Sequence, residues 1–407
     1  MMKTIKFLPI SLIVFLTFAC SEDDGQGQDD GSDNAGPLYA VDNRIFTPDG
    51  SLSYLVTASA LDDASIDITD FSGLPEFPGS ARVYGPEMQG VTYLTNGDPT
   101  ITEVTFAEDG EPEIGRVISF AGEGVEFTSG GSLNVFLSPT KAYFVSQTTL
   151  EVVVWNPEIM EITSTFPLPL TVTPGSFRLF LRGKPIIVND LLVLISYEWT
   201  DSDRFNNNGV TVTVVDTNSD AVVSNTVEER AVSFFAYAED NAGNLYFIPD
   251  TEVAFEHYLV PDRVQAPVML RMMAGEISFD PDWSRSFTEE LGTRFWGNSF
   301  PGPDGSVYFL ALDDELPEIE DVEITNDFSS IEGWKWYRLD GFDADFEETT
   351  IDAGFIGGFA FFADKEYYVQ RFNEADETYT LFKTTAPGGL KEGLTTPGFS
   401  YSMLRVR

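Results

Sequence analysis

Cysteine and histidine are almost absent from this sequence of 407 residues, in which Cys20 and His257 are the only examples. A zinc site made of these two residue types needs three or four ligands, so it cannot be assembled here. A Ser-His-Asp triad could use only His257, and no Gly-x-Ser-x-Gly elbow supplies its nucleophile. We therefore expect His257 to be structural or exposed, and we assign no catalytic residue from the sequence.

Positive charge is also scarce, since 23 Lys and Arg residues face 66 Asp and Glu residues and the formal net charge is −43. This balance argues against nucleic acid as a partner, because phosphate binding requires a positive surface. A bare anionic membrane surface is disfavoured for the same reason, so membrane contact is expected only through a lipid anchor. The excess acid serves solubility or, alternatively, supplies acidic loops that bind cations.

Two acidic segments are the candidates for cation binding. The run 313–327 lies between two expected strands. The stretch 201–209 looks superficially like a calcium loop, but Phe205 stands where an oxygen ligand is expected and no bidentate Glu follows. We favour a solvated loop and predict no resident cofactor beyond this calcium alternative.

Segments with the 3.6-residue apolar period of a long helix are lacking too. Aromatic residues make up 14% of the chain, and Gly and Pro are frequent, with 34 and 23 copies. This combination is typical of many short strands joined by turns. The sequence therefore predicts an all-β fold, with a core large enough to need no disulfide.

The N-terminus has the features of an export signal. Lys3 and Lys6 precede an apolar stretch, 7–18, that is too short to span a bilayer comfortably. It ends at Ala19-Cys20, which predicts a lipoprotein signal peptide over 1–19 and lipidation of Cys20. An ordinary cleaved signal peptide with an incidental cysteine is the alternative.

The segment 20–37 is acidic and almost free of apolar residues, which predicts a disordered tether. An acidic run directly behind a lipidated cysteine resembles the surface-export signal of Bacteroidetes lipoproteins. That resemblance implies display on the extracellular face of the outer membrane. The alternative is a plain spacer, which would not indicate on which face of the membrane the protein lies.

No second linker of this kind occurs in 38–407, so we expect one domain there. Apolar-aromatic strands recur in pairs about every 50 to 60 residues, and such units bury their faces by stacking around an axis. Ser53–Thr57 and Ser400–Leu404 look like two parts of one further blade. We predict a single β-propeller closed across the termini, with seven blades favoured, six or eight allowed, and a pair of β-sandwiches as the alternative. The six visible pairs are 91–94 with 101–106, 142–145 with 152–155, 191–194 with 210–215, 245–248 with 268–271, 307–310 with 336–339, and 367–369 with 379–382.

The segment that opens this domain, Leu55-Val56-Thr57-Ala58-Ser59-Ala60-Leu61-Asp62-Asp63-Ala64-Ser65-Ile66-Asp67-Ile68, resembles the opening of a family of Bacteroidetes propeller lipoproteins. That family, long labelled a domain of unknown function, includes members that capture ferric siderophores beside a TonB-dependent receptor. The resemblance also extends to the N-terminal lipoprotein signal, the length of the chain and the spacing of the predicted blades. It implies a ligand-capturing role but supplies no ligand motif to place on individual residues.

Basic and aromatic residues at expected strand ends are the candidate ligand contacts. Arginine offers a fork of donors to carboxylate or catecholate oxygens, and aromatic rings stack on sugars or planar ligands. Arg178 and Arg182 would share one face if their segment is a strand. The alternative for each arginine is a salt bridge with a surrounding acid, and for each aromatic a place in the core. The candidates are Arg178, Arg182, Lys184, Tyr197, Trp199, Arg294, Trp296 and Trp336.

These observations favour an outer-membrane-anchored binding lipoprotein that captures a small-molecule or glycan ligand. A ferric siderophore is one candidate, and a TonB-dependent outer-membrane receptor is the expected partner. A propeller enzyme acting on polysaccharide and a scaffold that docks a partner protein are the alternatives, because a fold alone does not decide function.

Overall fold

The chain from Gly36 to Arg407 forms one compact unit in the computed structural model. Among the residues described, no helix is long and apolar enough to cross a membrane. The structure describes residues 36–47, 50–68, 74–78, 81–95, 97–128, 132–200, 204–205, 208–250, 253–254, 256–257, 262, 264–286, 289–290, 296–302, 305–312, 334–349, 361–364, 366–373, 375–385 and 389–407.

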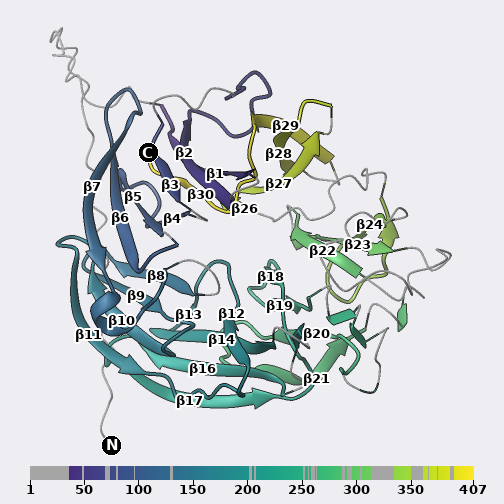
Figure 1. Cartoon of the computed structure of the whole chain (residues 1–407). Coiled ribbons are helices and arrows are strands. Elements are labelled where there is room, and N and C mark those ends of the chain that lie inside the picture. Colours follow the sequence, from purple (N-terminus) through teal and green to yellow (C-terminus); the bar gives the residue numbers. More distant parts are fainter. Residues whose placement is uncertain are drawn as a thin grey trace, which may run out of the picture. The chain divides into compact units, whose positions relative to one another are not determined.

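Seven antiparallel sheets follow one another around a centre (Figure 1). Blade 1 consists, from the innermost strand outward, of β30 (Met403–Arg405), β1 (Tyr39–Thr47), β2 (Gly50–Ala58) and β3 (Glu76–Pro78). Blade 2 consists of β4 (Arg82–Tyr84), β5 (Val91–Thr95), β6 (Thr100–Phe106) and β7 (Pro112–Ser119). Blade 3 consists of β8 (Leu133–Ser138), β9 (Lys141–Val145), β10 (Glu151–Asn156) and β11 (Glu161–Pro167). A short 3₁₀ turn, η1 (Ala121–Glu123), joins blades 2 and 3.

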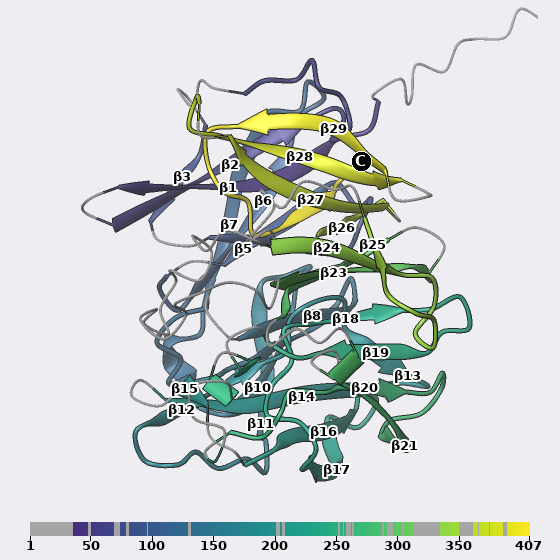
Figure 2. The same cartoon turned by 90° about the vertical axis from the view of Figure 1, so that its right-hand side faces the viewer.

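The remaining blades repeat this order, and Figure 2 shows the same fold from the side. Blade 4 has a divided innermost strand and consists of β12 (Ser176–Phe180) with β13 (Ile186–Val188), β14 (Leu191–Thr200) with the short β15 (Arg204–Phe205), β16 (Val210–Asp216) and β17 (Ala221–Glu228). Blade 5 consists of β18 (Ala236–Glu239), β19 (Leu245–Ile248), β20 (Met269–Met272) and β21 (Phe279–Arg285). Blade 6 consists of β22 (Trp296–Pro301), β23 (Val307–Leu312), β24 (Trp334–Leu339) and β25 (Glu347–Glu348). Blade 7 consists of β26 (Phe361–Ala363), β27 (Glu366–Asn373), β28 (Thr378–Thr385) and β29 (Gly389–Thr396).

The two middle strands of each blade carry most of the core. In β10, the run from Val152 to Trp155 is buried on both faces, because a neighbouring blade covers each side. The outermost strands read differently: β17 alternates polar residues with exposed Val223 and Val227. The core therefore lies between adjacent blades, as the seven-bladed propeller predicted from the sequence requires.

The ring closes by pairing the two ends of the described chain. The C-terminal strand β30 pairs with β1, with Met403 opposite Val41 and Leu404 opposite Ala40. The predicted closure across the termini is thus confirmed. A second connection follows β2, where the segment 61–68 runs beside β29: Leu394 donates its N–H to the Leu61 carbonyl at 2.9 Å.

Candidate anion-binding site

A break in the innermost strand of blade 4 projects residues toward the centre of the ring. Both β12 and β13 pair with β14, but four residues, 182–185, stand opposite a single residue of that strand. Gly183 has a φ of +132°, a conformation that side chains with a Cβ rarely adopt. This bulge carries Arg182 and Lys184.

Arg182 shares the centre of the ring with a second arginine, Arg82, from blade 2. Arg82 begins β4 and is only 8% exposed, and its guanidinium carbon lies 5.2 Å from the centroid of the Tyr401 ring. Burial, and after it the positive charge of Arg82, lowers the pKa of Arg182 to about 10. Tyr84, Tyr197 and Tyr401 also act electrostatically on Arg182. We call these five residues the central basic site.

Two like charges in a partly desolvated centre are unfavourable, because burial and repulsion both penalise the charged forms. The buried Asp42 carboxyl, whose pKa the charge of Arg82 lowers, offsets part of that cost, and a bound anion would offset more of it. Guanidinium groups match carboxylate, phosphate and phenolate oxygens with paired donors, and the tyrosine rings offer faces for planar groups. The central basic site can therefore recognise an anion inside a strongly acidic protein.

Further tyrosines come from other innermost and neighbouring strands. The Tyr237 hydroxyl, on β18, donates to the Lys184 carbonyl and so holds the bulge. Burial raises the pKa of Tyr237 and of Tyr367, on β27, and the nearby Glu239 carboxylate raises both further. These phenols stay protonated at neutral pH and can donate hydrogen bonds.

A small cavity of about 30 Å³ lies beside the bulge. Lys184, Ile186 and Tyr237 contribute to its lining, together with parts of β8 and β14. This volume is enough for about one water molecule.

The structure places the predicted contacts in three environments. Arg182, Lys184 and Tyr197 lie at or beside the central basic site, with Lys184 exposed and Tyr197 buried. Trp199 packs against the hydrophobic core beside β14, and Trp336 is a buried residue of β24. Arg294 lies outside the described residues.

Other predicted residues cannot be placed in full. Trp296 begins β22, but its side chain is outside the part that is described. Cys20, the signal peptide and the tether up to residue 35 lie outside it, as do the acidic run 313–327 and most of 201–207.

Arg178 and Arg182 do not share a strand face, because β12 ends at Phe180 before the bulge begins. Arg178 is 7% exposed and is held inside blade 4, where it donates to Ser196 and Thr211 at 3.1 Å each. Its guanidinium also lies 3.5 Å from the buried Glu198 carboxylate. Arg178 therefore forms the salt bridge that the sequence allowed as an alternative.

Arg82, Tyr84 and Tyr401 are the site residues that the sequence reading missed. Arg82 and Tyr84 are the first and third residues of β4, but a strand of three residues is too short to show a periodic pattern of apolar and polar residues. Basic residues are scarce in this sequence, and this scarcity was the one signal that could have pointed to Arg82. It applied equally to Arg82 and to Arg182.

No group of three or more His, Cys, Asp and Glu side chains within the described ranges is arranged to hold a metal ion. His257 is half-buried, and its Nδ1 lies 2.7 Å from the Val264 carbonyl.

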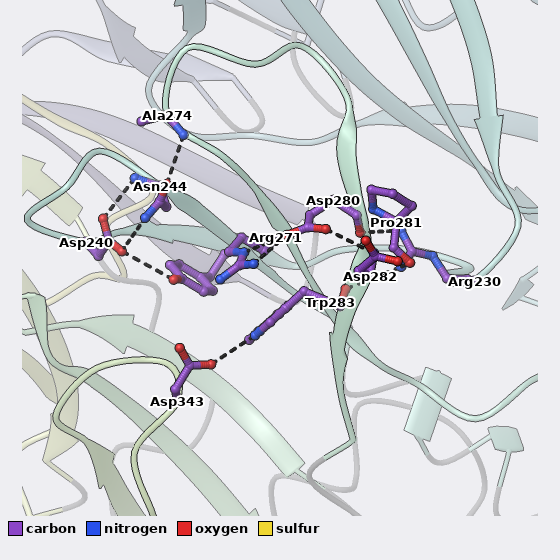
Figure 3. Close-up of polar contacts among 11 residues, drawn as sticks. Arg230, Asp240, Asn244, Arg271, Ala274, Asp280, Pro281, Asp282, Trp283 and Asp343 are labelled. Carbon is purple, nitrogen blue, oxygen red and sulfur yellow. Dashed lines mark hydrogen bonds and ion pairs between the residues drawn. The ribbon is translucent and has the colours of Figure 1, made fainter.

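A second polar cluster, on blade 5, joins the sheets rather than binding a ligand (Figure 3). The Asp240 carboxylate accepts hydrogen bonds from the Asn244 backbone and side chain at 2.9 Å, and Asn244 accepts one from the Ala274 N–H at 2.9 Å. These bonds fix the turn between β18 and β19 as an Asx-type turn.

The same cluster reaches blade 6 through aromatic side chains. Arg271 pairs with Asp280 and lies 5.3 Å from the centroid of Trp283, whose indole N–H donates to Asp343 at 3.0 Å (Figure 3). Tyr246 contacts Trp283 edge to face with centroids 5.2 Å apart. Every charge in this cluster has a protein partner, so we assign it a structural role.

The seven four-stranded to six-stranded sheets define a seven-bladed β-propeller. No protein-family model and no curated protein matches the sequence. Solved structures match its fold. A candidate 6-phosphogluconolactonase from Bacteroides fragilis is 8% identical with a TM-score of 0.54, over 93% of this chain and 100% of that one. A periplasmic gluconolactonase from Pseudomonas aeruginosa is 10% identical with a TM-score of 0.54, over 91% and 99%. A protein from Lactobacillus plantarum is 10% identical with a TM-score of 0.50, also over 91% and 99%. At these identities the likeness establishes the fold alone.

Proposed function

We propose that this protein is a lipid-anchored binding protein that captures an anionic ligand at the central basic site. The observation that carries the proposal is the approach of Arg82 and Arg182 in the centre of a chain with a net charge of −43. Two arginines close together in a partly desolvated place attract anions, even though the buried Asp42 carboxylate already interacts with Arg82. Binding sites of propellers and other closed β folds are commonly formed at such centres.

The predicted lipid anchor and acidic tether would hold the ring at the outer membrane, on its extracellular face. A protein there would pass its ligand to a TonB-dependent receptor. Ferric siderophores and acidic glycans fit the site best, because both carry several anionic oxygens and the siderophores of the catecholate class also carry planar rings.

A panel of ligands tests this proposal. The full-length protein in detergent should melt at a higher temperature with at least one ferric siderophore or acidic oligosaccharide, since ligand binding to the native state stabilises it. Neutral oligosaccharides of the same length are the control and should give smaller shifts. If no anionic ligand shifts the melting temperature, the proposed capture role is wrong.

An enzymatic role is the second candidate, because two of the structural neighbours carry lactonase names. Incubation with glucono-lactone and with acidic polysaccharide, followed by product analysis, separates the two roles. Turnover that is lost in an Arg182→Gln variant would favour the enzyme, whereas binding without turnover supports capture.

A further inference from the structure

Within the part of the chain that the structure describes, three polar side chains near the inner edge of blades 2 and 3 are buried without hydrogen-bond partners. They are Arg82 through Nε, Thr95 through its hydroxyl, and Asn134 through both atoms of its amide. The three residues are 8%, 1% and 8% exposed. Four unsatisfied atoms on three neighbouring side chains are unusual, because buried polar groups in native proteins nearly always have a partner.

The strand register places Arg82 and Thr95 together. Arg82 is the cross-strand partner of Thr95 in the pairing of β4 with β5, so both side chains leave the same face of blade 2. On the same face Tyr93 stacks against Phe136 of β8 with ring centroids 5.0 Å apart. This face of blade 2 is therefore the one that packs against blade 3.

Asn134 faces the same space from the other side. Its neighbour Val135 packs into the cluster between blades 3 and 4, so alternation directs Asn134 and Phe136 toward blade 2. Blades of a propeller repeat the same strand directions, which makes β5 run opposite to β8. Asn134 and Thr95 consequently lie on the same side of the Tyr93–Phe136 pair. We call Arg82, Thr95 and Asn134 the interblade polar cluster.

The cluster has four N–H and O–H donors but only two acceptor atoms. The guanidinium Nε–H donates only, the amide supplies two N–H donors and one acceptor oxygen, and the hydroxyl can both donate and accept. An oxyanion is the natural complement, because it accepts several hydrogen bonds and is drawn to the arginine charge. A neutral water would satisfy fewer donors and none of the charge.

We propose that the interblade polar cluster binds a carboxylate group of the captured molecule, and so selects carboxylate-bearing ligands among anions. This inference rests on the proposed function, because Arg82 belongs to both the cluster and the central basic site. Arg82 would bridge the two, with Thr95 and Asn134 acting as specificity-determining residues.

Isothermal titration of the full-length protein with citrate tests the inference, with sorbitol as the uncharged control. We expect Asn134→Leu and Thr95→Val each to weaken citrate binding about tenfold, the loss that follows from one hydrogen bond to a charged group. Asn134→Asp should weaken it further by repulsion. Ser233→Ala, which removes a buried unpartnered hydroxyl in the segment between β17 and β18, should leave the affinity unchanged.

Two results would overturn the inference. One is wild-type citrate affinity in all three variants at Asn134 and Thr95, which would mean that the cluster holds only water. The other is the absence of citrate binding to the wild type. If that protein still binds a ferric siderophore or an acidic glycan, the proposed function stands and only the carboxylate selectivity fails.

Discussion

Arg178 shows how the surroundings of an arginine decide its role. Its donors are engaged by Thr171, Ser196 and Thr211, and its charge faces Glu198, which is 5% exposed. Arg182, four residues later, lies instead near a second positive charge. The two arginines of this short segment therefore have different surroundings, and only Arg182 belongs to the site that we propose for a ligand.

Arg178→Ala should destabilise the protein without changing the ligand affinity of the folded fraction. Removing one partner of a buried ion pair leaves Glu198 charged without its counterion, which costs about 3–5 kcal/mol. Urea denaturation measures the loss, and the double variant Arg178→Met/Glu198→Leu should recover much of it. Unchanged stability together with weakened binding would instead assign Arg178 to the ligand site.

The burial of each strand explains which strands could be predicted from the sequence. All six predicted strand pairs coincide with the two middle strands of blades 2 to 7, because these strands are buried on both faces and read as apolar runs. Some innermost strands are short, such as β4, and some outermost ones, such as β17, have no buried residue. Neither kind leaves a clear pattern, so the bulge at 182–185 and the position of Arg82 could not be predicted.

The segment 61–68 is an element whose role only the structure shows. It lies along β29, where Thr395 donates to the Ile66 carbonyl at 3.0 Å and Ile68 donates to the Thr395 carbonyl at 3.0 Å. Ile66 and Ile68 pack against the cluster between blades 1 and 7. It therefore joins the first blade to the last, in addition to the pairing of β1 with β30.

Gly393→Ala should weaken this connection. A Cβ at Gly393 would collide with the backbone of Leu61 and would lie 2.9 Å from the Asp62 Cα atom, so the segment must shift. We expect a loss of about 1–3 kcal/mol in the free energy of unfolding, typical of overpacking. Gly122→Ala is the control, since its Cβ would meet no atom within 4 Å. Equal stabilities of the two variants would show that 61–68 does not hold the ring closed.

A titratable residue of β1, Asp42, holds the turn before β30. Asp42 is 1% exposed and accepts hydrogen bonds from the Tyr401 N–H at 3.1 Å and the Ser402 hydroxyl at 2.9 Å. Burial raises the pKa of Asp42 to about 7, although these bonds and the charge of Arg82 oppose the rise. The folded protein therefore retains a proton that the unfolded chain releases near pH 4.

Because the folded-state pKa is the higher one, the stability that Asp42 contributes is present at low pH and is lost as the pH rises through about 7. Asp42→Asn keeps the shape of the side chain and removes its titratable carboxyl group. The variant should thus gain stability relative to the wild type between pH 5 and pH 8, by up to about 3 kcal/mol. Urea denaturation of both proteins across this range measures the difference. A difference that does not change with pH would contradict the account of Asp42.

At the scale of the whole molecule, charge is distributed unevenly. The chain has an acidic excess of 43 charges, yet its ring centre holds Arg82 and Arg182. An acidic exterior repels anions at long range, whereas a partly desolvated pair of arginines attracts them at short range. Such an arrangement favours ligands whose anionic oxygens can enter the centre and contact both guanidinium groups.

The central claim is that these two arginines bind the ligand. Its most direct test is isothermal titration of the best anionic ligand of the panel into the wild type and Arg182→Gln, with urea stability measured in parallel. We predict that the variant folds with near-wild-type stability, since it relieves a repulsion, and that its Kd rises at least about tenfold. An unchanged Kd in a well-folded Arg182→Gln variant would contradict the claim.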